Sequence, residues 1–384
     1  MNAPTPRIAI IGAGPGGLTC ARILQRQGIP VTVHDLDASR TSRNQGGTLD
    51  MHPGTGQHAL RAAGLWDAFT ALSRPEGEQM RLVSRDGRVL IDAVPAQDGR
   101  GKPEIDRGQL RDLLLDSLEP GTVRWGHQLT HAEPLGEGTH RLHFADGSTA
   151  EADLVVGADG AWSKVRRLVS DATPVYTGVT FVETGLDDAD HRHPERAALT
   201  GNGTMMALDN NQGIIAQRNS GGHIRVYIGM RTDEDWYQRR NLDLNDNQAV
   251  REALLKEFTG WGDDLLGFIT DTDTDTDTGY TNRPLHALPV PHTWPHTQGV
   301  TLLGDAAHLM SPFSGMGANL AMRDGADLAA ALIEHPSTDD AITAYEDILF
   351  PRSSEAAEGA AEGINSAFAP DSATQALAHM TRDQ

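Results

Sequence analysis

The segment from residue 7 to residue 35 constrains the fold more than any other part of this sequence. It opens with a short apolar run (RIAII), passes through a glycine-rich turn into a helix-forming stretch, and ends in a second apolar run whose last residue is Asp35. Gly12, Gly14 and Gly17 give the turn the pattern G-x-G-x-x-G. This order of elements predicts one parallel βαβ unit of about 30 residues.

The chemistry of this turn indicates a ligand. Glycines let the backbone approach a pyrophosphate, and the N-terminus of the following helix favours its negative charge. An acid at the end of the second strand can accept hydrogen bonds from a ribose. A turn that serves packing alone is the alternative, but it leaves Asp35 unexplained. We therefore expect a dinucleotide-binding site here.

The rest of the chain changes from one hydrophobic pattern to another. Residues 54–72 and 105–118 have helical periodicity, whereas residues 175–230 alternate in the manner of short antiparallel strands. Residues 317–333 and the tail from 340 to 369 are helical again. A length of 384 residues suits two domains. The chain is expected to leave the first domain, build a second, and return.

Charge and composition exclude several classes of protein. The 32 Lys and Arg residues against 53 Asp and Glu residues give a net charge of −21, which disfavours binding to nucleic acid. Cys20 is the single cysteine, which suits a reduced cytosol. No window reaches about 18 uninterrupted apolar residues, and the start of the chain does not resemble a signal peptide. We expect a cytoplasmic protein with no membrane partner.

Two further motifs indicate which dinucleotide is bound. The first, residues 153–166 (DLVVGADGAWSKVR), is a buried strand that ends in Asp159 and leads into a helix start. The second joins Gly304-Asp305-Ala306-Ala307-His308 to residues 312–319 (PFSGMGAN). The three motifs in this order resemble those of the FAD-dependent aromatic hydroxylases, the single-component flavoprotein monooxygenases with the para-hydroxybenzoate hydroxylase fold. A nicotinamide-dependent dehydrogenase would share only the glycine-rich turn.

The resemblance is closest to the tetracycline-inactivating flavin monooxygenases, the tetracycline destructases, and covers nearly the whole chain. It rests also on residues 46–52 (GGTLDMH) and 104–111 (EIDRGQLR). It implies these cofactor-binding residues: Gly12, Gly14, Gly17, Asp35, Arg43, Asp50, Arg107, Asp159, Asp305, Gly315, Gly317 and Asn319. Among them Arg43 would meet NADPH. Two ordinary alternatives stay open: Arg107 could pair with a neighbouring acid, and Asp50 could be a turn residue.

The resemblance also implies a reaction. FAD would be reduced by NADPH or NADH and would react with O₂ to form a flavin C4a-hydroperoxide, which hydroxylates a polycyclic aromatic or enolic small molecule. Tetracycline-type substrates, with a role in antibiotic resistance, or aromatic polyketides are expected. No side chain acts as a catalyst, because the flavin performs the chemistry. A monomer is implied. The alternative is a flavin-dependent reductase or dehydrogenase of a lipid or isoprenoid.

The expected substrate contacts depart from the tetracycline enzymes. Those enzymes hold the polar edge of the drug with a Gln, an Arg and a His, where this chain has Glu183, Gly203 or Thr204, and Arg225. Leu36 also follows Asp35, where the family usually has an Arg near the adenosine. The added negative charge argues against the same binding pose for tetracycline. The predicted substrate-binding residues are Glu183, Arg225, Pro312, Phe313 and Gly315.

The predicted fold class is α/β, with a Rossmann-like FAD-binding domain on a parallel sheet, a substrate domain on a mostly antiparallel sheet, and a C-terminal bridging helix. The expected domain bounds are 1–72, 103–173 and 283–350 for the FAD-binding domain, 73–102 and 174–282 for the substrate domain, and 351–384 for the helix. We expect no metal site at His286, His292, His296 and His308, because prolines interrupt them and no acid completes a set. The Asp-Thr repeat at 271–278 is assigned no function.

Overall fold

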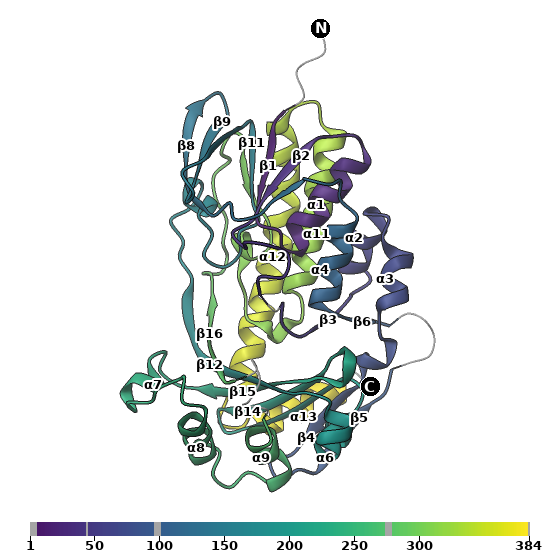
Figure 1. Ribbon diagram of the computed structural model, residues 1–384, viewed down its shortest axis with the longest axis vertical. Helices are drawn as coiled ribbons and strands as arrows, with labels where there is room; N and C mark the ends of the chain where they lie inside the picture. The colour runs from purple at the N-terminus through teal and green to yellow at the C-terminus, as the bar shows by residue number, and fades with distance from the viewer. Residues whose placement is uncertain (1–5, 44, 96–100, 273–278, 383–384) are drawn as a thin grey trace. The chain divides into compact units, whose positions relative to one another are not determined.

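The computed structural model describes residues 6–43, 45–95, 101–272 and 279–382 (Figure 1). Most of the Asp-Thr repeat lies outside these residues. The backbone divides into two compact units. The first unit comprises Met1–Ser73, Arg107–Val175 and His286–Ala360. The second comprises Arg74–Asp106, Tyr176–Leu285 and Ala361–Gln384.

A five-stranded parallel sheet is the centre of the first unit. Its strands, in spatial order, are β17 (Val300–Leu302), β11 (Leu154–Gly157), β1 (Ile8–Ile11), β2 (Val31–His34) and β7 (Val123–Arg124). Ile10 of β1 lies between Val156 and Val33 in register. β1, β11 and β17 are buried along their whole length, as expected for a parallel sheet covered on both faces.

Helices and a small antiparallel sheet complete this unit. The helices are α1 (Pro15–Arg26), α2 (Gly56–Ala62), α3 (Trp66–Leu72), α4 (Arg107–Asp116), α10 (Asp305–His308), α11 (Gly317–Glu334) and α12 (Thr338–Ala367), whose residues after Ala360 are assigned to the second unit. The antiparallel sheet has the order β10 (Thr149–Ala152), β9 (Thr139–Phe144) and β8 (Leu129–Gly136). The short strand β3 (Thr48–Asp50) and 3₁₀ turns at Val165–Leu168 and Pro312–Ser314 connect these elements.

Helices α1 and α11 lie side by side and approach closely (Figure 1). A Cβ built at Gly325 of α11 would lie 2.3 Å from the carbonyl oxygen of Gly16 in α1. A Cβ at Gly16 would in turn lie 2.5 Å from the carbonyl oxygen of Ala321. Only glycine fits at these two positions, so the distance between the helices depends on them.

The second unit is built on a seven-stranded, mostly antiparallel sheet. Its strands, in spatial order, are β16 (Thr281–Ala287), β12 (Val175–Leu186), β15 (Ile224–Arg231), β14 (Gln212–Arg218), β13 (Thr204–Asp209), β4 (Met80–Val83) and β5 (Val89–Ala93). The other elements are β6 (Glu104–Asp106), α5 (Ala189–Arg192), α6 (Pro194–Thr200), α7 (Trp236–Arg239), α8 (Asn247–Glu257), α9 (Asp263–Thr270), α13 (Ser372–Arg382), and 3₁₀ turns at Pro75–Glu78 and Ser220–Gly222.

The two faces of this sheet differ in character. Val182, Val226 and Ile214 are fully buried on one face, where they belong to the core that includes residues of α8 and α9. Because side chains alternate along a strand, the residues between them point to the other face. That second face carries half-buried polar side chains in the middle of the sheet, among them Glu183 and Arg225.

The predicted fold class is confirmed, with one parallel and one mostly antiparallel sheet. The helical segment 54–72 is divided into α2 and α3, because Gly64 takes a positive φ of 69° that ends the first helix. Helices α5 and α6 interrupt the strand-rich stretch of residues 175–230. Within the described residues, no helix is both long and apolar enough to cross a membrane.

Gly325→Ala is expected to destabilise the protein by roughly 1–3 kcal/mol, because the new methyl group overlaps the backbone of α1. Gly359→Ala is the matched control, since this exposed glycine of α12 has open space around a built Cβ. It should stabilise the protein by about 0.5–1 kcal/mol through helix propensity. Urea unfolding of both variants measures the difference, and equal midpoints would contradict the packing argument.

Candidate functional site

The glycine-rich turn between β1 and α1 is shaped by two glycines and left open at the third. Gly12 has a φ of 112°, and a Cβ there would lie 2.2 Å from the carbonyl oxygen of Ala158. A Cβ at Gly17 would lie 2.4 Å from the carbonyl oxygen of Gly12. Gly14, by contrast, has nothing within 4 Å of a built Cβ, and no side chain caps α1. The N–H groups of its first turn are therefore left without a side-chain partner.

Asp35 follows β2 and ties that strand to the turn. Its buried carboxylate accepts hydrogen bonds from the backbone N–H of Ala13 at 2.6 Å and from that of Asp37 at 2.8 Å. A carboxylate has further lone pairs, so these bonds leave acceptor capacity for a hydroxyl group. The acid has a structural role here as well as the expected role toward a ribose.

Arg111 supplies a guanidinium beside Asp35 that the sequence analysis did not assign. From α4 it donates to the carbonyl oxygen of Ala13 at 3.1 Å and to the Asp37 carboxylate at 3.1 Å. Leu36, by contrast, is 61% exposed. Arg43 also pairs with Asp37, at 3.1 Å, and is largely exposed. The chain thus has a guanidinium from α4 beside Asp35, where the residue that follows Asp35 supplies none.

Arg107 contacts the loop that precedes β3, and Asp50 is the last residue of that strand. The Arg107 backbone N–H donates to the carbonyl oxygen of Gly47 at 3.0 Å, and its exposed side chain begins α4. No acid in the described part of the chain forms an ion pair with it, so the alternative of a neighbouring acid finds no support there. A cation at a helix N-terminus opposes the helix dipole, so an anionic ligand would stabilise it. The Asp50 carboxylate is 36% exposed.

The loop after β11 holds Asp159 in a network of protein contacts. Its carboxylate accepts from the Lys164 backbone N–H at 2.6 Å and from the Ser163 hydroxyl. Burial raises the pKa of the Asp159 carboxyl. Arg166 is also buried, and it donates to the carbonyl oxygens of Asp305 at 3.0 Å and Ala306 at 2.8 Å. These bonds fix the loops after β11 and β17 against each other.

The loop after β17 carries an exposed Asp305 above a buried carboxylate. Asp324 of α11 accepts from the Gly304 backbone N–H at 2.9 Å, from His308 Nε2 at 2.6 Å, and from Arg352 at 2.9 Å. Burial alone would raise the pKa of Asp324, but His308 and Arg352 outweigh it and lower that pKa. Burial likewise opposes the charge on His308, yet Asp324 raises the pKa of its imidazole. We infer a hydrogen-bonded cluster around the Asp324 carboxylate.

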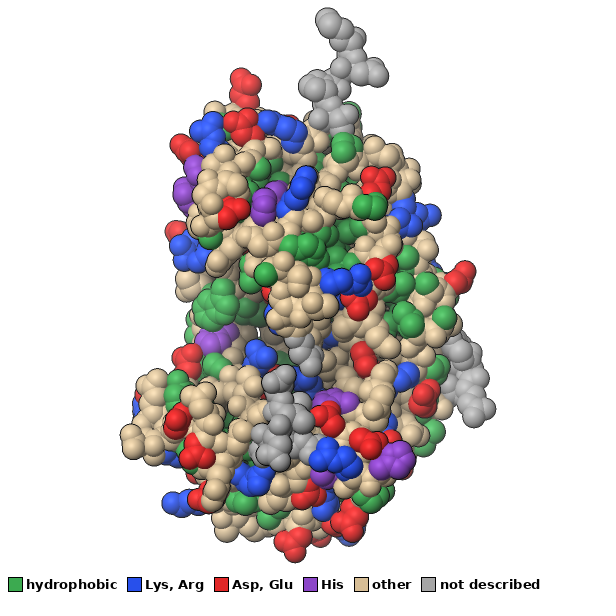
Figure 2. All heavy atoms as spheres, in the orientation of Figure 1, with side chains coloured by type: hydrophobic (Ala, Val, Ile, Leu, Met, Phe, Trp, Pro, Cys, Tyr) green, Lys and Arg blue, Asp and Glu red, His purple; other side chains and the backbone are tan. Residues whose placement is uncertain are grey.

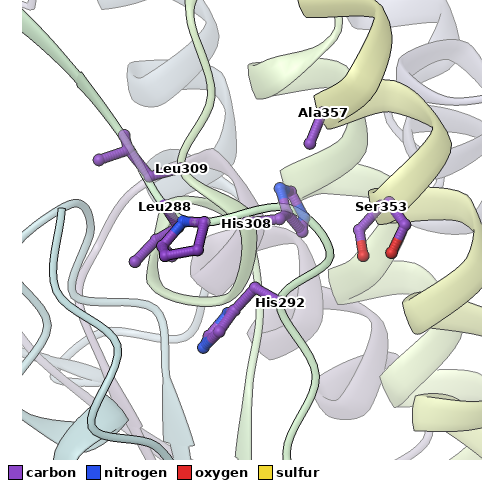
Figure 3. Close-up of a pocket in the computed structure, with 8 residues that line it drawn as sticks. Leu288, His292, His308, Leu309, Ser353 and Ala357 are labelled. Atoms are coloured by element: carbon purple, nitrogen blue, oxygen red, sulfur yellow. The ribbon is translucent and has the colours of Figure 1, made fainter. Parts of the chain in front are cut away.

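His308 also lines a small cavity (Figure 3). The cavity has a volume of about 10 Å³, which is space for one water-sized sphere. The residues labelled around it are Leu288, His292, His308, Leu309, Ser353 and Ala357. His292 bonds to the Ala307 carbonyl oxygen at 2.5 Å and to Ser170 at 3.0 Å, and burial lowers its pKa. In the described chain, no group of three or more His, Cys, Asp or Glu residues could hold a metal ion.

The N-terminus of α11 is a second open helix end. Gly315 takes a positive φ of 65°, Gly317 has nothing within 4 Å of a built Cβ, and no side chain caps the helix. Asn319 is fully buried and its amide is used within the protein. It accepts from the His52 backbone N–H at 2.9 Å and donates to the Asp50 carbonyl oxygen at 2.7 Å. Pro312 is exposed and Phe313 half-buried in the turn that precedes this helix.

In the second unit, Glu183 is neutralised by two arginines. Its carboxylate lies 3.4 Å from Arg225 and 3.2 Å from Arg283. Glu183 and Arg225 have 15% and 17% exposed side chains, whereas that of Arg283 is 57% exposed. The negative charge expected from Glu183 is therefore compensated, and the three residues together carry a net charge of +1.

These groups fit FAD. A dinucleotide needs donors for two phosphates, acceptors for sugar hydroxyls, and a surface for a flat ring system. The open N-termini of α1 and α11 and the cation of Arg107 match the first need. Asp35 and Asp305 match the second. The glycine-rich end of α11 leaves space for the third.

His34, the last residue of β2, belongs to a buried aromatic cluster beside Asp35. Its Nδ1 lies 3.1 Å from the Nδ1 of His127, and its ring stacks on Phe144 with centroids 4.7 Å apart. Burial and the neighbouring imidazole lower the pKa of His34 to about 4. The unfolded chain, with a pKa of 6.5, binds this proton more readily. His34 thus contributes stability above pH 6.5 that is lost as the pH falls toward 4.

The wild-type protein is expected to lose about 3 kcal/mol of unfolding free energy through His34 as the pH falls from 6.5 to 4. His34→Gln removes the titrating group, so its stability should fall less over this range, although it starts lower. Urea unfolding of both proteins at pH 7.5, 6 and 5 measures the two slopes. Parallel slopes would show that His34 does not cause the loss.

Comparison with known proteins agrees with this geometry. The model of the FAD binding domain family matches residues 5–359. The chain is 32% identical to Monooxygenase penA of Penicillium thymicola, over 91% of this chain and 92% of the relative.

Solved structures share the fold. HpxO of Klebsiella pneumoniae, crystallised with FAD and uric acid, has a TM-score of 0.81 at 22% identity and covers 98% of this chain and 93% of its own. The tetracycline destructase Tet(55) has a TM-score of 0.76 at 21% identity, over 100% of this chain and 96% of its own. At such identities these likenesses concern the fold alone.

The resemblance to FAD-dependent aromatic hydroxylases is confirmed. The family model spans all the residues that carry the three motifs, and the relative that is 32% identical is named a monooxygenase. The chain belongs to the FAD binding domain family and is an FAD-dependent monooxygenase.

Proposed function

We propose that this monooxygenase binds FAD in its first unit, takes electrons from NADPH or NADH, and hydroxylates a flat polycyclic aromatic or enolic molecule that carries a negative charge. The observation that carries the cofactor site is the glycine-rich turn before α1, where a Cβ built at Gly14 meets no atom within 4 Å and the Asp35 carboxylate accepts from the neighbouring Ala13 backbone N–H. Backbone N–H groups that lack a partner and a nearby acid are what a nucleotide diphosphate with its ribose requires.

Some of the predicted cofactor residues would contact FAD, whereas others hold those residues in place. Gly14 and Gly317 leave space at the two helix ends, Arg107 supplies a positive charge, and Asp305 supplies an exposed acceptor for hydroxyl groups. Other predicted residues, among them Gly12 and Gly17, shape this arrangement through contacts within the protein. Asp159 orders the loop after β11, and Asn319 joins β3 to α11.

An exposed aromatic and cationic surface on the loop after β11 supports a nicotinamide dinucleotide as reductant. Trp162 is 62% exposed and contacts His286 edge to face at 5.2 Å. Lys164 and Arg167 are exposed nearby, with no ion pair in the described residues. On the face drawn in Figure 2, acidic and basic side chains are interspersed. A flat base and a phosphate would find stacking and charge on this loop.

The protein positions the reactants and excludes water. FAD, when bound, supplies the redox chemistry and the activation of O₂. The turn at Pro312–Ser314 and the open end of α11 present backbone N–H groups that favour negative charge on a neighbouring ligand. No side-chain nucleophile or paired-acid catalyst is needed for this reaction.

The polar face of the seven-stranded sheet supports an anionic substrate. Glu183 and its two arginines carry one excess positive charge, and Arg225 Nε is buried without a hydrogen-bond partner in the described residues. Tyr227 lies directly across from Glu183 in register and adds an aromatic ring. A phenolate, enolate or carboxylate on a flat ring would complete this set. Tetracyclines and aromatic polyketides carry such groups.

The first test is anaerobic reduction of bound FAD, followed at its visible absorbance. NADPH and NADH are compared, each with and without tetracycline, an aromatic polyketide and a hydroxylated aromatic acid. We expect one of these compounds to accelerate reduction at least tenfold and, with air admitted, to gain one oxygen atom by mass spectrometry. A product that gains hydrogen without oxygen would indicate a reductase. Failure of the protein to bind FAD would contradict the proposal.

Arg225→Gln tests the substrate class. Loss of one charge-assisted hydrogen bond, worth about 1.5–3 kcal/mol, should raise KM for a hydroxylated aromatic acid by roughly 10- to 100-fold. The KM for its neutral methyl ester should change little. Arg239→Gln, an exposed arginine paired with Asp233 and Asp235, is the matched control. An equal rise for acid and ester would show that Arg225 does not recognise the charge.

A further inference from the structure

Asp50 and His52 form a carboxylate–imidazole pair at the end of β3. His52 Nε2 lies 2.8 Å from Asp50 Oδ2, and their side chains are 18% and 36% exposed, respectively. His52 is the only partner of the Asp50 carboxylate in the described part of the chain. An imidazole N–H that donates to a carboxylate both orients it and withdraws part of its charge.

The buried side-chain amide of Asn319 holds the backbone of this pair. Asn319 accepts from the His52 backbone N–H and donates to the Asp50 carbonyl oxygen, so a single side chain fixes both ends of this three-residue segment. Met51, between them, is fully buried. An exposed ion pair normally moves freely and contributes little, whereas this pair has a fixed backbone. The packing around Asn319 and Met51 therefore fixes the positions of Asp50 and His52.

The carboxylate of this pair lies beside the open end of α11. A Cβ built at Gly315 would be 3.9 Å from both oxygens of Asp50, and no other atom lies within 4 Å of it. Gly315 is exposed and leads to the uncapped N-terminus at Gly317. Under the proposed function, this is where the flavin ring system binds. Asp50 is then a negative charge next to a ring that becomes more negative when it takes up two electrons and one proton.

We propose that His52 is a positioning residue that sets the reduction potential of the bound flavin through Asp50. The inference rests on the proposed FAD site in the first unit. When His52 donates to Asp50, less negative charge faces the ring and reduction is easier. Removing the donor leaves a bare carboxylate, which opposes reduction. Removing the carboxylate itself has the opposite effect.

The test is the midpoint potential of FAD bound to the full chain, measured by equilibration with a redox dye. His52→Leu should lower the equilibrium constant for two-electron reduction about tenfold, which is roughly 30 mV. His52→Gln keeps an N–H donor and should restore most of this shift. Asp50→Asn should shift the potential in the positive direction. His191→Leu is the matched control, because His191 forms an exposed pair with Asp188 at 2.7 Å in the second unit.

The outcomes separate this inference from the proposed function. Wild-type protein that does not bind FAD contradicts the proposed function. Variants that bind FAD with the wild-type potential contradict the inference alone. A shift for His52→Leu that His52→Gln does not reverse would show that hydrogen-bond donation is not the cause. Urea unfolding of each variant identifies any that lose the fold. Among the variants that fold, the inference requires a more positive midpoint potential for Asp50→Asn and a potential near the wild-type value for His52→Gln.

Discussion

The buried carboxylate of Asp324 is the interaction on which the cofactor side of the first unit depends. A fully buried charge costs several kcal/mol unless it is paired and hydrogen-bonded. Asp324 meets this requirement with the Gly304 N–H, His308 and Arg352, which come from the end of β17, from α10 and from α12. One side chain of α11 thereby fixes the loop that carries Asp305. The loop can leave that acid exposed because its backbone is held from below.

The open helix ends have the opposite energetic character. Four N–H groups at a helix start need partners, and most helices satisfy some of them with a capping side chain. Here α1 and α11 begin after Gly14 and Met316 without one, as do α2, α3 and α9, whereas α8 is capped by Asp246. At α1 and α11, Gly14 and Gly317 also leave open space around a built Cβ, while Gly16 and Gly325 let the two helices lie close together.

How much of the site can be predicted from the sequence depends on how far apart in the chain two interacting residues lie. The glycine-rich turn and Asp35 lie within one βαβ unit, so their spacing alone indicates the site. Arg111 could not be found in this way, because the carbonyl oxygen it holds belongs to a residue 98 positions earlier. Arg166 is a similar case, with its acceptor 140 positions later. Composition shows that such arginines exist, but only the packing of the sheet shows which backbone atoms they meet.

At the predicted substrate-binding residues of the second unit, the sequence gives the charge of each side chain but not which charges lie together. From sequence, Glu183 in place of a glutamine adds a negative charge that argues against the tetracycline pose. In the structure both Arg225 and Arg283 pair with that carboxylate, so the three residues together carry a net charge of +1. Arg225 is two positions away from direct register with Glu183 across the sheet, and Arg283 is on a different strand. A single substitution therefore does not determine what a site binds. The groups that the sheet brings together must be counted as a set, and here their net charge of +1 supports the anionic substrate proposed above.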